Sequence, residues 1–319
     1  MTKRPDESKI YFATDIHGSD TCWKKFVNAG KYYNVDALIL GGDLTGKGIV
    51  YCLEQSDRLY KATFMGKQYS LSTSDQIADF DKKVRMNGFY PFRTTKENFD
   101  DILQSEEKRH DLFLRLMIET LRDWIAFAEQ KLKNSNIDLY VTAGNDDDLA
   151  IDSVLKQSDT VIHSDQKVVE IDQYHEMISS SFSNMTPWKC PRDVPEDELS
   201  QKIESMTVQV SNMKNCIFNL HVPPINSTLD NAPALDQDLR PKQSGQLITG
   251  VGSTAVRKAI EQHQPLLGLH GHIHESKGFN RIGRTLCINP GSTYSEGILQ
   301  GVIVELRKDG IGLYTPVQG

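Results

Sequence analysis

The feature that most constrains this chain is a buried strand that ends in two glycines and an acid. Residues 37–40 form the short apolar run Ala-Leu-Ile-Leu, and Gly41, Gly42 and Asp43 follow it directly. A short apolar run bounded by turn residues is typical of a parallel strand covered on both faces. The glycines permit a sharp turn and the close approach of another group. Asp43 is therefore predicted at the carboxyl end of a strand, where open α/β sheets place their ligands. The alternative is an Asp that caps the next helix or turn.

Four other predicted strands end in polar side chains. They are residues 9–14 before Asp15 and His17, 138–142 before Asn145, 216–220 before His221, and 266–269 before His272 and His274. In an extended segment the side chains at i and i+2 point to the same side, so Asp15 and His17 can hold one cation. Each piece alone has another explanation: an Asp–His hydrogen-bonded pair without a metal, or a His-x-His that is a surface or core pair. Their joint occurrence in a chain with nine histidines favours a metal site.

The donor atoms of these side chains indicate which metals would bind. Nitrogen and oxygen ligands suit Zn, Mn, Fe or Ni better than Mg or Ca alone. We predict that Asp43 bridges two divalent ions and that the other strand ends supply the remaining ligands. Two metals about 3.5–4 Å apart are used for phosphoryl-ester hydrolysis, because the ions bind the non-bridging oxygens, orient an attacking hydroxide and neutralise developing charge. The pattern therefore predicts a phosphoester hydrolase with two divalent metal ions as cofactors.

The order of these motifs resembles that of the calcineurin-like metallophosphoesterase superfamily, in a bacterial or archaeal type of member. The motifs are Asp15-Ile16-His17, Gly42-Asp43, Gly144-Asn145, His221 and Gly271-His272-Ile273-His274. The resemblance implies an α/β fold, a four-layer α/β/β/α sandwich with mixed sheets and the site at the strand ends. It also implies the ligand sets: Asp15, His17 and His274 for one metal, Asn145, His221 and His272 for the other, and Asp43 as the bridge. Asn145 would also contact the phosphate.

One position departs from the superfamily pattern. The pattern usually continues Gly-Asn-His, and that His helps to protonate the leaving group, whereas this chain has Asp146. Some phosphodiesterases of the superfamily also lack the His, so the departure favours a phosphodiester over a monoester substrate. Asp146 donates the proton if burial raises its pKa. The alternative is a structural Asp146, with a metal-bound water in its place. Asp147 and Asp148 are predicted to begin the next helix.

Residues 46–135 interrupt the alternation of strands and helices. Gly66-Lys67 between two short runs predicts a two-residue hairpin of type II′, and an apolar stripe at helical spacing predicts a long helix. We interpret residues 1–319 as a single metallophosphoesterase domain with a hairpin-plus-helix cap inserted at about 46–135. A cap beside a rigid site commonly shapes specificity. Residues 226–250 are polar and are predicted to form a long surface loop.

Composition excludes some partners. The formal net charge of −7 argues against broad nucleic-acid binding, which needs a basic surface. No apolar run approaches the ~20 residues of a membrane span, and residues 1–8 lack the apolar core of a signal peptide. The five cysteines are scattered and form no Cys-x-x-Cys pair, which is typical of free thiols in a reducing compartment. We therefore expect a cytoplasmic protein that acts on a small-molecule phosphoester, with no membrane and no nucleic-acid partner.

The function that these observations favour is dinuclear metal-dependent hydrolysis of a phosphoester, more specifically a phosphodiester, by metal-bound hydroxide. Two alternatives stay open. The first is a nuclease or nucleotide hydrolase of the same fold, which a basic groove beside His221 would favour. The second is a non-catalytic metal-binding scaffold that uses the fold for protein binding. Loss of ligands would mark the scaffold, yet all seven candidate ligands are present.

Overall fold

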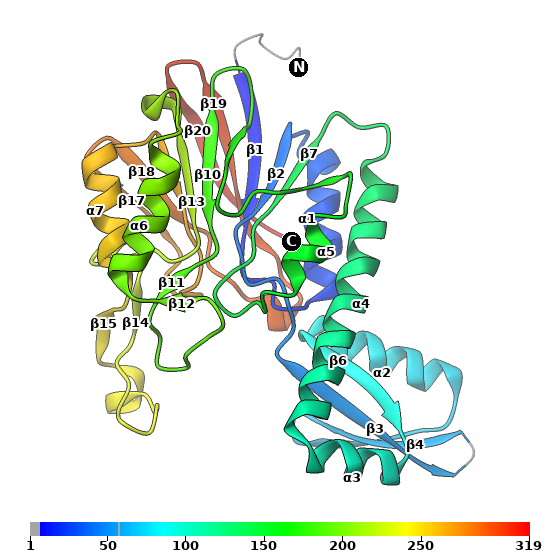
Figure 1. The fold of residues 1–319 in the computed structure, drawn as a ribbon. Coiled ribbons are helices and arrows are strands. Elements are labelled where there is room, and N and C mark those ends of the chain that lie inside the picture. The colour runs from blue at the N-terminus through cyan, green and yellow to red at the C-terminus, as the bar shows by residue number, and fades with distance from the viewer. Residues whose placement is uncertain (1–6, 57) are drawn as a thin grey trace.

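Two six-stranded sheets form the centre of the computed structural model, which describes residues 7–56 and 58–319 (Figure 1). The strands of the first sheet are β1 (Glu7–Ala13), β2 (Ala37–Leu40), β7 (Asp138–Val141), β8 (Val161–His163), β19 (Gln300–Arg307) and β20 (Gly310–Gln318). Those of the second are β9 (Val168–Glu170), β10 (Glu176–Ser180), β13 (Ile217–Leu220), β16 (Leu267–Leu269), β17 (Gly278–Ile282) and β18 (Thr285–Asn289). The strand orders are β20-β19-β1-β2-β7-β8 and β17-β18-β16-β13-β10-β9.

Both sheets are mixed, with parallel strands at the centre and antiparallel strands at the margins. β1, β2, β7 and β8 run parallel, and β19 and β20 continue the sheet antiparallel. β10, β13, β16 and β18 run parallel between antiparallel β9 and β17. Side chains alternate along a strand, so in β1 Ile10 and Phe12 pack against the second sheet while Tyr11 and Ala13 pack against helices. This alternation makes β1 apolar on both faces.

Helices cover the outer face of each sheet and complete four layers (Figure 1). The helices on the first sheet are α1 (Asp20–Tyr32), α4 (Glu106–Leu132) and α5 (Ile151–Leu155), and those on the second are α6 (Glu196–Thr207) and α7 (Thr254–His263). The rings of Trp23 in α1 and Trp124 in α4 stack with centroids 5.1 Å apart. Such a pair adds about 0.5–1.5 kcal/mol beyond the burial of its area. The stack fixes the long helix α4 against α1 within the helical layer of the first sheet.

Residues 48–104 form a separate lobe at the lower right of Figure 1. Its elements are β3 (Gly48–Ser56), β4 (Leu59–Phe64), β5 (Lys67–Leu71), α2 (Ser74–Met86), β6 (Phe89–Thr94) and α3 (Lys96–Gln104). The strands form one sheet in the order β5-β4-β3-β6. The lobe has a small apolar core of its own, in which Phe64 lies edge-on to Phe80. Tyr90 of β6, by contrast, belongs to the main core, so the lobe is also packed against the sandwich.

The hairpin predicted in this lobe is present, but its turn is different. β4 and β5 pair with Phe64 opposite Lys67, so the turn residues are Met65 and Gly66 rather than Gly66 and Lys67. Their φ angles are 50° and 73°. Positive φ at both positions is the type I′ turn, not the predicted type II′. The prediction failed because it assigned positive φ to glycine alone, and Met65 also adopts it.

Residues 226–250 contain a small hairpin where the sequence predicted only a loop. β14 (Asn231–Pro233) pairs with β15 (Ile248–Gly250) and projects at the lower left of Figure 1. The buried carboxylate of Asp230 fixes its base, since it accepts hydrogen bonds from the N–H groups of Asn226, Ser227 and Gly252 at 2.8–3.2 Å. The remaining elements are β11 (Ser183–Asn184), β12 (Asp193–Val194) and 3₁₀ turns at Met213–Asn215, Lys242–Gly245 and Tyr294–Glu296.

Membrane spans are not among these elements. Across the described ranges, none of the helices combines the length and apolar character needed to cross a bilayer.

Candidate metal centre

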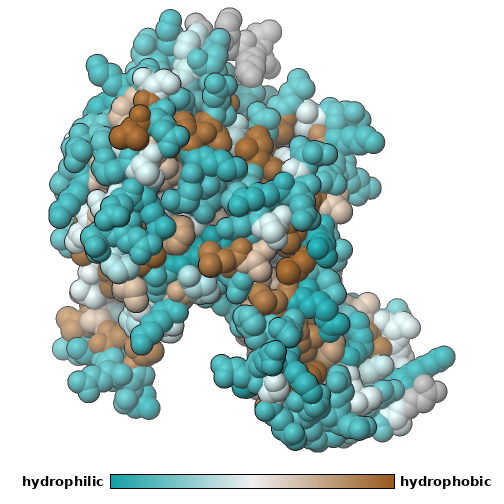
Figure 2. Space-filling view, viewed as in Figure 1, coloured by the Kyte–Doolittle hydropathy of each residue, from teal (hydrophilic) through white to brown (hydrophobic). Residues whose placement is uncertain are grey.

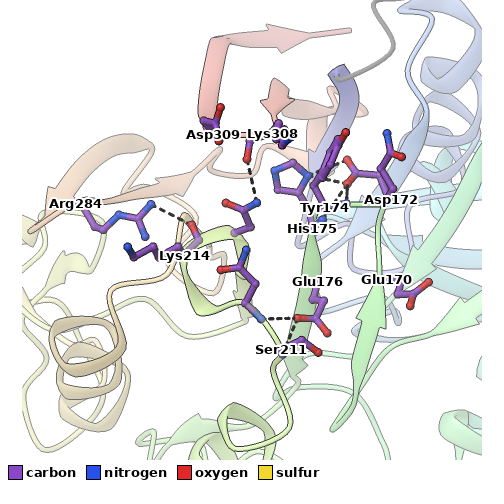
Figure 3. Close-up of a pocket in the computed structure, with 13 residues that line it drawn as sticks. Glu170, Asp172, Tyr174, His175, Glu176, Ser211, Lys214, Arg284, Lys308 and Asp309 are labelled. Carbon is purple, nitrogen blue, oxygen red and sulfur yellow. Dashed lines mark hydrogen bonds and ion pairs between the residues drawn. The ribbon is translucent and has the colours of Figure 1, made fainter.

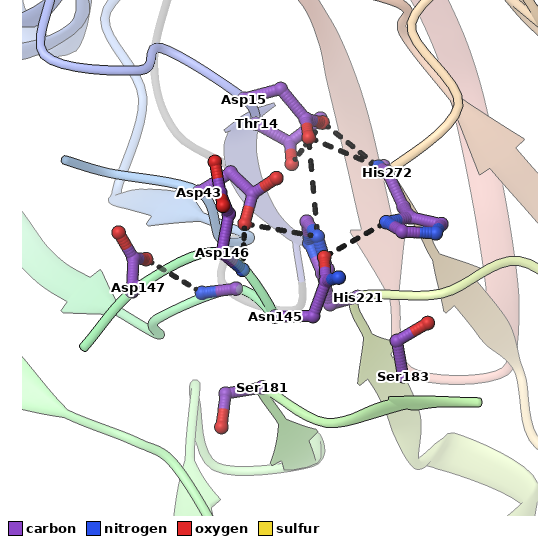
Figure 4. Close-up of polar contacts among 12 residues, drawn as sticks. Thr14, Asp15, Asp43, Asn145, Asp146, Asp147, Ser181, Ser183, His221 and His272 are labelled. Atoms are coloured by element: carbon purple, nitrogen blue, oxygen red, sulfur yellow. Dashed lines mark hydrogen bonds and ion pairs between the residues drawn. The ribbon is translucent and has the colours of Figure 1, made fainter. Parts of the chain in front are cut away.

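The seven residues predicted as metal ligands lie together at one edge of the sandwich. Figure 4 shows Asp15, Asp43, Asn145, His221 and His272 among them. They follow β1, β2 and β7 of the first sheet (Asp15, His17, Asp43, Asn145) and β13 and β16 of the second (His221, His272, His274). The carboxyl ends of these parallel strands meet at this edge, which is why loops from both sheets converge there. Residues distant in sequence thus form one buried cluster of carboxylate, amide and imidazole groups.

Asp43 stands between two overlapping groups of donor atoms. Its Oδ2 lies 3.5 Å from Nε2 of His17, and its Oδ1 lies 3.4 Å from Nε2 of His221. The groups are Asp15, His17, Asp43 and His274 on one side, and Asp43, His221 and His272 on the other, each with donor atoms within 4.8 Å of one another. Nδ1 of His272 is 2.9 Å from Oδ1 of Asn145, which joins Asn145 to the second group. The geometry therefore separates the residues into two sets that share Asp43.

His221 has the orientation that a metal ligand needs. Its Nδ1 lies 3.0 Å from the Gly41 carbonyl oxygen and donates a hydrogen bond to it. Its buried Nε2 has no hydrogen-bond partner in the described part of the chain and faces Asp43. Ligating histidines commonly donate their other ring N–H to a backbone carbonyl, which fixes the ring. On the other side of Asp43, the Nε2 atoms of His17 and His274 are 2.9 Å apart, a separation that requires a shared proton or a shared cation.

The electrostatics of the centre favour added positive charge. Burial lowers the pKa of His221, but the facing carboxylates, Asp43 first, outweigh burial and raise it to about 9. Burial raises the pKa of Asp43, yet His221 and His17 hold it well below its usual value. Burial lowers the pKa of His17 to about 3 and that of His272 to about 4, so both rings are neutral at pH 7. A divalent cation fits this donor set, because it would bind the neutral rings and take the place of the proton on His221.

The loops that carry the ligands hold their backbone in the left-handed region. The φ angle is 53° at Asp15, 39° at His17, 48° at Asp43 and 65° at His272. Each such non-glycine residue costs on the order of 1–3 kcal/mol and persists only where the surrounding structure determines it. The N–H groups of Asp15 and His17 donate to the carbonyls of Gly42 and Asp43, both at 2.9 Å, and tie the two loops together. Strain at four of the seven candidate ligands is typical of a functional site.

Glycines allow the ligands to approach the backbone closely. A Cβ on Gly42 would overlap the imidazole of His221, and one on Gly144 would overlap the carboxylate of Asp43. The φ angle of Gly42 is also 127°, which side chains rarely permit. The close approach predicted from the glycines after the β2 strand is therefore present, and the approaching group is a candidate ligand.

Asp146 lies at the rim of the centre. Its side chain is 35% exposed and forms an ion pair with Lys47. The burial on which its predicted acid role depended is therefore only partial. Lys47 was not identified from the sequence, because a single Lys in a turn carries no signal. Burial lowers the pKa of Lys47, but Asp43 and Asp146 outweigh burial and raise it, so a cation stands beside the candidate ligands.

Asp147 does not begin a helix, contrary to the prediction, since α5 starts at Ile151. Its fully buried carboxylate accepts hydrogen bonds from the N–H groups of Leu44, Thr45 and Gly144 at 2.8–3.1 Å. These bonds link the loop after β2 to the loop after β7 and so fix Asp43 relative to Asn145. Asp148 likewise lies in a turn rather than at a helix start. Its Oδ1 accepts a hydrogen bond from the N–H of Ala150 at 2.8 Å.

A segment that sequence reasoning missed orients Asn145. Oδ1 of Asp193 accepts a hydrogen bond from Nδ2 of Asn145 at 2.9 Å, which turns the amide oxygen toward His272. The backbone N–H of Arg192 donates to the Asn145 carbonyl at 3.1 Å. Oδ2 of Asp193 accepts from the N–H groups of Thr186 and Cys190 at 3.0 and 2.9 Å. Asp193 therefore positions a candidate ligand and anchors a neighbouring loop at the same time.

Replacing Asp193 by Ala should weaken binding at the metal position that Asn145 serves by about 10–100-fold, as is usual when a partner of a ligand is removed. The amide of Asn145 would lose the acceptor that fixes its orientation. Calorimetric titration of the metal-free protein with Mn²⁺ measures this, with Asp197→Ala on α6 as a control on an unrelated acid. Two unchanged binding steps in Asp193→Ala would show that Asn145 needs no such support.

A second pocket of about 580 Å³ lies away from the centre, between the ends of β9 and β10 and the 3₁₀ turn at 213–215 (Figure 3). Figure 3 shows a mixture of acids and bases around it, including Lys214, Arg284 and Glu176. The Arg284 guanidinium is already engaged in hydrogen bonds, because it donates to the carbonyls of Gln264 and Lys214 at 3.1 and 3.0 Å. None of the groups of metal-competent side chains found in the described residues lies in this pocket.

The Asp172–His175 pair in this pocket predicts a pH dependence of stability. Burial raises the pKa of Asp172, but bonds from His175, Ser8 and the Tyr174 N–H lower it to about 2, below the value near 3.9 of an unfolded Asp. A depressed folded pKa stabilises the protein above the unfolded pKa, and this contribution is lost as pH falls from about 4 toward 2. The free energy of unfolding, measured by urea titration, should therefore fall less between pH 5 and pH 3 in Asp172→Asn than in the wild type. Asp309→Asn, at an exposed position on the same pocket, is the control, and parallel curves for Asp172→Asn and wild type would refute the assignment.

Comparison with known proteins supports the fold. No family model matches the chain. The protein MJ1162 of Methanocaldococcus jannaschii, described only as uncharacterized, is 32% identical over 131 residues, which is 40% of this chain and 53% of that protein. The match thus spans about half the length of that relative.

Solved structures resemble the whole chain. One aligns over 98% of this chain and 99% of its own, with a TM-score of 0.57 and 12% identity. TT1561 of Thermus thermophilus gives a TM-score of 0.49 at 12% identity over 98% of both chains, and an archaeal phosphodiesterase gives 0.35 at 13% over 98% and 99%. At this identity the first likeness shows the fold alone. The predicted fold class, a four-layer α/β/β/α sandwich with mixed sheets, is confirmed.

Proposed function

We propose that this protein hydrolyses a phosphodiester with the help of two divalent metal ions. The observation that carries the proposal is the position of Asp43, whose two carboxylate oxygens face His17 on one side and His221 on the other. A single metal would need only one of these sets, whereas two sets that share a carboxylate suit a pair of ions. When bound, such a pair supplies Lewis acidity toward a phosphoryl oxygen and a nucleophile at neutral pH.

The residues of the chain contribute binding and orientation. Asp15, His17 and His274 would hold one ion, and Asn145, His221 and His272 the other, with Asp43 as the bridge. One N–H of the Asn145 amide donates to Asp193, and the other would donate a hydrogen bond to a phosphate oxygen. The Lys47 ammonium at the rim adds positive charge where a phosphate anion would enter. Positioning together with fixed charge is the main source of catalysis in phosphoryl transfer.

The direct test is hydrolysis of a chromogenic phosphodiester and the matching monoester by metal-stripped protein. Mn²⁺, Zn²⁺, Fe²⁺ or Ni²⁺ is added back singly, and a sample without metal is the control. We expect metal-dependent cleavage with a higher kcat/KM for the diester. Tight binding of two metals without turnover of either ester would reject the proposal, and so would turnover that does not depend on metal.

Replacing Asp146 by Asn tests the proton donor. Asp146 is partly exposed and paired with Lys47, so we expect Asp146→Asn to lower kcat/KM by less than about tenfold and to leave the pH–rate profile unchanged in shape. A general acid contributes about 10²–10⁴-fold and adds a limb to that profile. Loss of a limb in Asp146→Asn, with a loss in rate of more than a hundredfold, would instead assign the acid role to Asp146.

A further inference from the structure

A pocket of about 1060 Å³ opens directly from the candidate metal centre. His17, Asp43, Asn145, His272 and His274 form its floor. Its walls come from two segments that the metal site does not use, residues 184–190 on one side and 225–252 on the other. Pockets of several hundred Å³ are the usual size for small-molecule ligands, so this pocket has room for more than a phosphate group.

The walls are predominantly apolar. Met185, Pro187 and Trp188 line one side, and Pro233, Leu235 and Leu239 line the other. Trp188, Met185 and Leu239 are 64%, 53% and 43% exposed, although large apolar side chains are usually buried. Figure 2 shows apolar side chains gathered on the hairpin that projects at the lower left, with a hollow between it and the lobe at the lower right. Exposed apolar residues concentrated beside one site mark a surface for an apolar ligand.

The charges in the pocket do not suit a polyanion. Besides the candidate ligands, the charged residues that line it within the described chain are Lys47, Asp146, Glu196 and Glu275, so one cation stands against three acids. Lys47 is itself paired with Asp146. Nucleic-acid binding requires several cations placed along the phosphates. The pocket therefore does not favour the nuclease alternative.

The loop that presents Trp188 is held rigid and is connected to the centre. Asp193 accepts hydrogen bonds from the N–H groups of Thr186 and Cys190 through Oδ2, and from Asn145 through Oδ1. On the opposite wall, Asp230 fixes the base of the β14–β15 hairpin. These bonds fix the backbone beside Trp188 and the base of the hairpin, which reduces the entropy lost at those positions when a ligand binds.

Of the region 46–135, which was predicted to shape specificity, Lys47 alone lines this pocket within the described residues. Specificity would therefore come from the two walls rather than from the predicted cap.

We propose that this pocket binds the apolar alcohol group of a phosphodiester, an alkyl chain that lies between Trp188 and the β14–β15 hairpin while the phosphate lies at the metal centre. The inference rests on the proposed function and specifies its substrate class. Apolar burial contributes in proportion to the area removed from water, so a longer alkyl group should bind better until the pocket is full.

The test uses two diesters with the same 4-nitrophenyl leaving group and either a methyl or a hexyl group as the second ester. We expect the Mn²⁺-loaded protein to show at least a tenfold higher kcat/KM for the hexyl diester. Trp188→Ala and Leu239→Ala should each remove most of this preference, measured as the ratio of kcat/KM for the hexyl diester to kcat/KM for the methyl diester. Tyr32→Ala, at an exposed aromatic residue on α1 outside the pocket, is the matched control and should leave the preference intact.

A binding measurement separates this inference from the proposed function. Calorimetric titration with hexyl phosphate and methyl phosphate should show at least fivefold tighter binding of the hexyl compound, lost in Trp188→Ala. Such binding without turnover of any ester would retain the pocket and reject the hydrolase. Turnover or binding without an alkyl preference would overturn the pocket and retain the hydrolase. A higher kcat/KM for thymidine 5′-(4-nitrophenyl) phosphate than for the hexyl diester would also overturn it, in favour of a nucleotide substrate.

Discussion

Replacing Asp43 by Asn should lower kcat/KM for a phosphodiester by about a thousandfold or more and reduce bound metal from two equivalents to one. Asn keeps the size of the side chain but loses its charge and one acceptor oxygen. Because the two oxygens face His17 and His221 separately, this single change affects both metal positions. Loss of a group that merely supports a ligand costs about 10–100-fold, so loss of a ligand shared by two ions should cost more.

Metal content by elemental analysis and kcat/KM in Mn²⁺ measure the effect of Asp43→Asn. Asp123→Asn, at an exposed position on α4, is the control for an Asp-to-Asn change in itself. The thermal unfolding midpoint of the metal-free variant shows whether the fold is intact. If Asp43→Asn still binds two metal equivalents and retains a tenth of the wild-type activity, Asp43 is not a bridge.

The candidate centre could be predicted from the sequence because its residues follow strand ends. Short apolar strands before Asp43, His221 and His272 determine the edge at which these side chains emerge, and the packing of two sheets brings the edges together. The strand positions follow from local apolar runs, so the prediction needed no knowledge of the loops. The four layers were implied by the family resemblance instead, and the structure shows their basis in β1, where Tyr11 and Phe12 are covered on opposite faces.

The supporting residues could not be predicted, because their roles arise from contacts between distant segments. Asp193 contacts Asn145 across 48 positions of the chain, and Lys47 contacts Asp146 across 99. Asp147 was misassigned because an acid after a strand is a common helix start. Here the backbone N–H groups of the neighbouring loop donate hydrogen bonds to its carboxylate instead. Polar residues in loops carry no periodic pattern, so their partners become visible only when the strands are packed.

The pocket walls illustrate the same limit at a larger scale. Residues 226–250 are polar in composition and give no strand pattern, yet the β14–β15 hairpin within them lines the same pocket as Trp188. Two short strands of three residues each are too brief for alternation to be recognised. The part of the molecule that would select a substrate therefore lies where the sequence signal is weakest, while the part that would hold the metals lies where it is strongest.

Replacing Arg192 by Met should lower the free energy of unfolding by about 3–5 kcal/mol, the usual cost of removing one partner of a buried ion pair. The Arg192 side chain is fully buried and forms an ion pair with Asp152 at 2.8 Å, with Asp165 at 3.7 Å. It also donates to the backbone carbonyls of Asp147 and Asp148 at 2.9 and 3.1 Å. Met fills a similar volume but leaves the buried Asp165 carboxylate without its countercharge.

Arg93→Met is the matched control for Arg192→Met, because Arg93 forms an ion pair with Asp81 at 2.7 Å but is 41% exposed. An exposed pair contributes about 0–1 kcal/mol, so urea unfolding should separate the two variants by several kcal/mol. Arg192 also supports the loop of Asn145, so Arg192→Met should bind the second Mn²⁺ equivalent more weakly at temperatures where it stays folded, and Arg93→Met should not. Equal unfolding free energies for the two variants would show that the buried network compensates for the lost charge. Unchanged binding of the second Mn²⁺ equivalent in Arg192→Met would show that the Asp147 and Asp193 carboxylates hold the Asn145 loop without it.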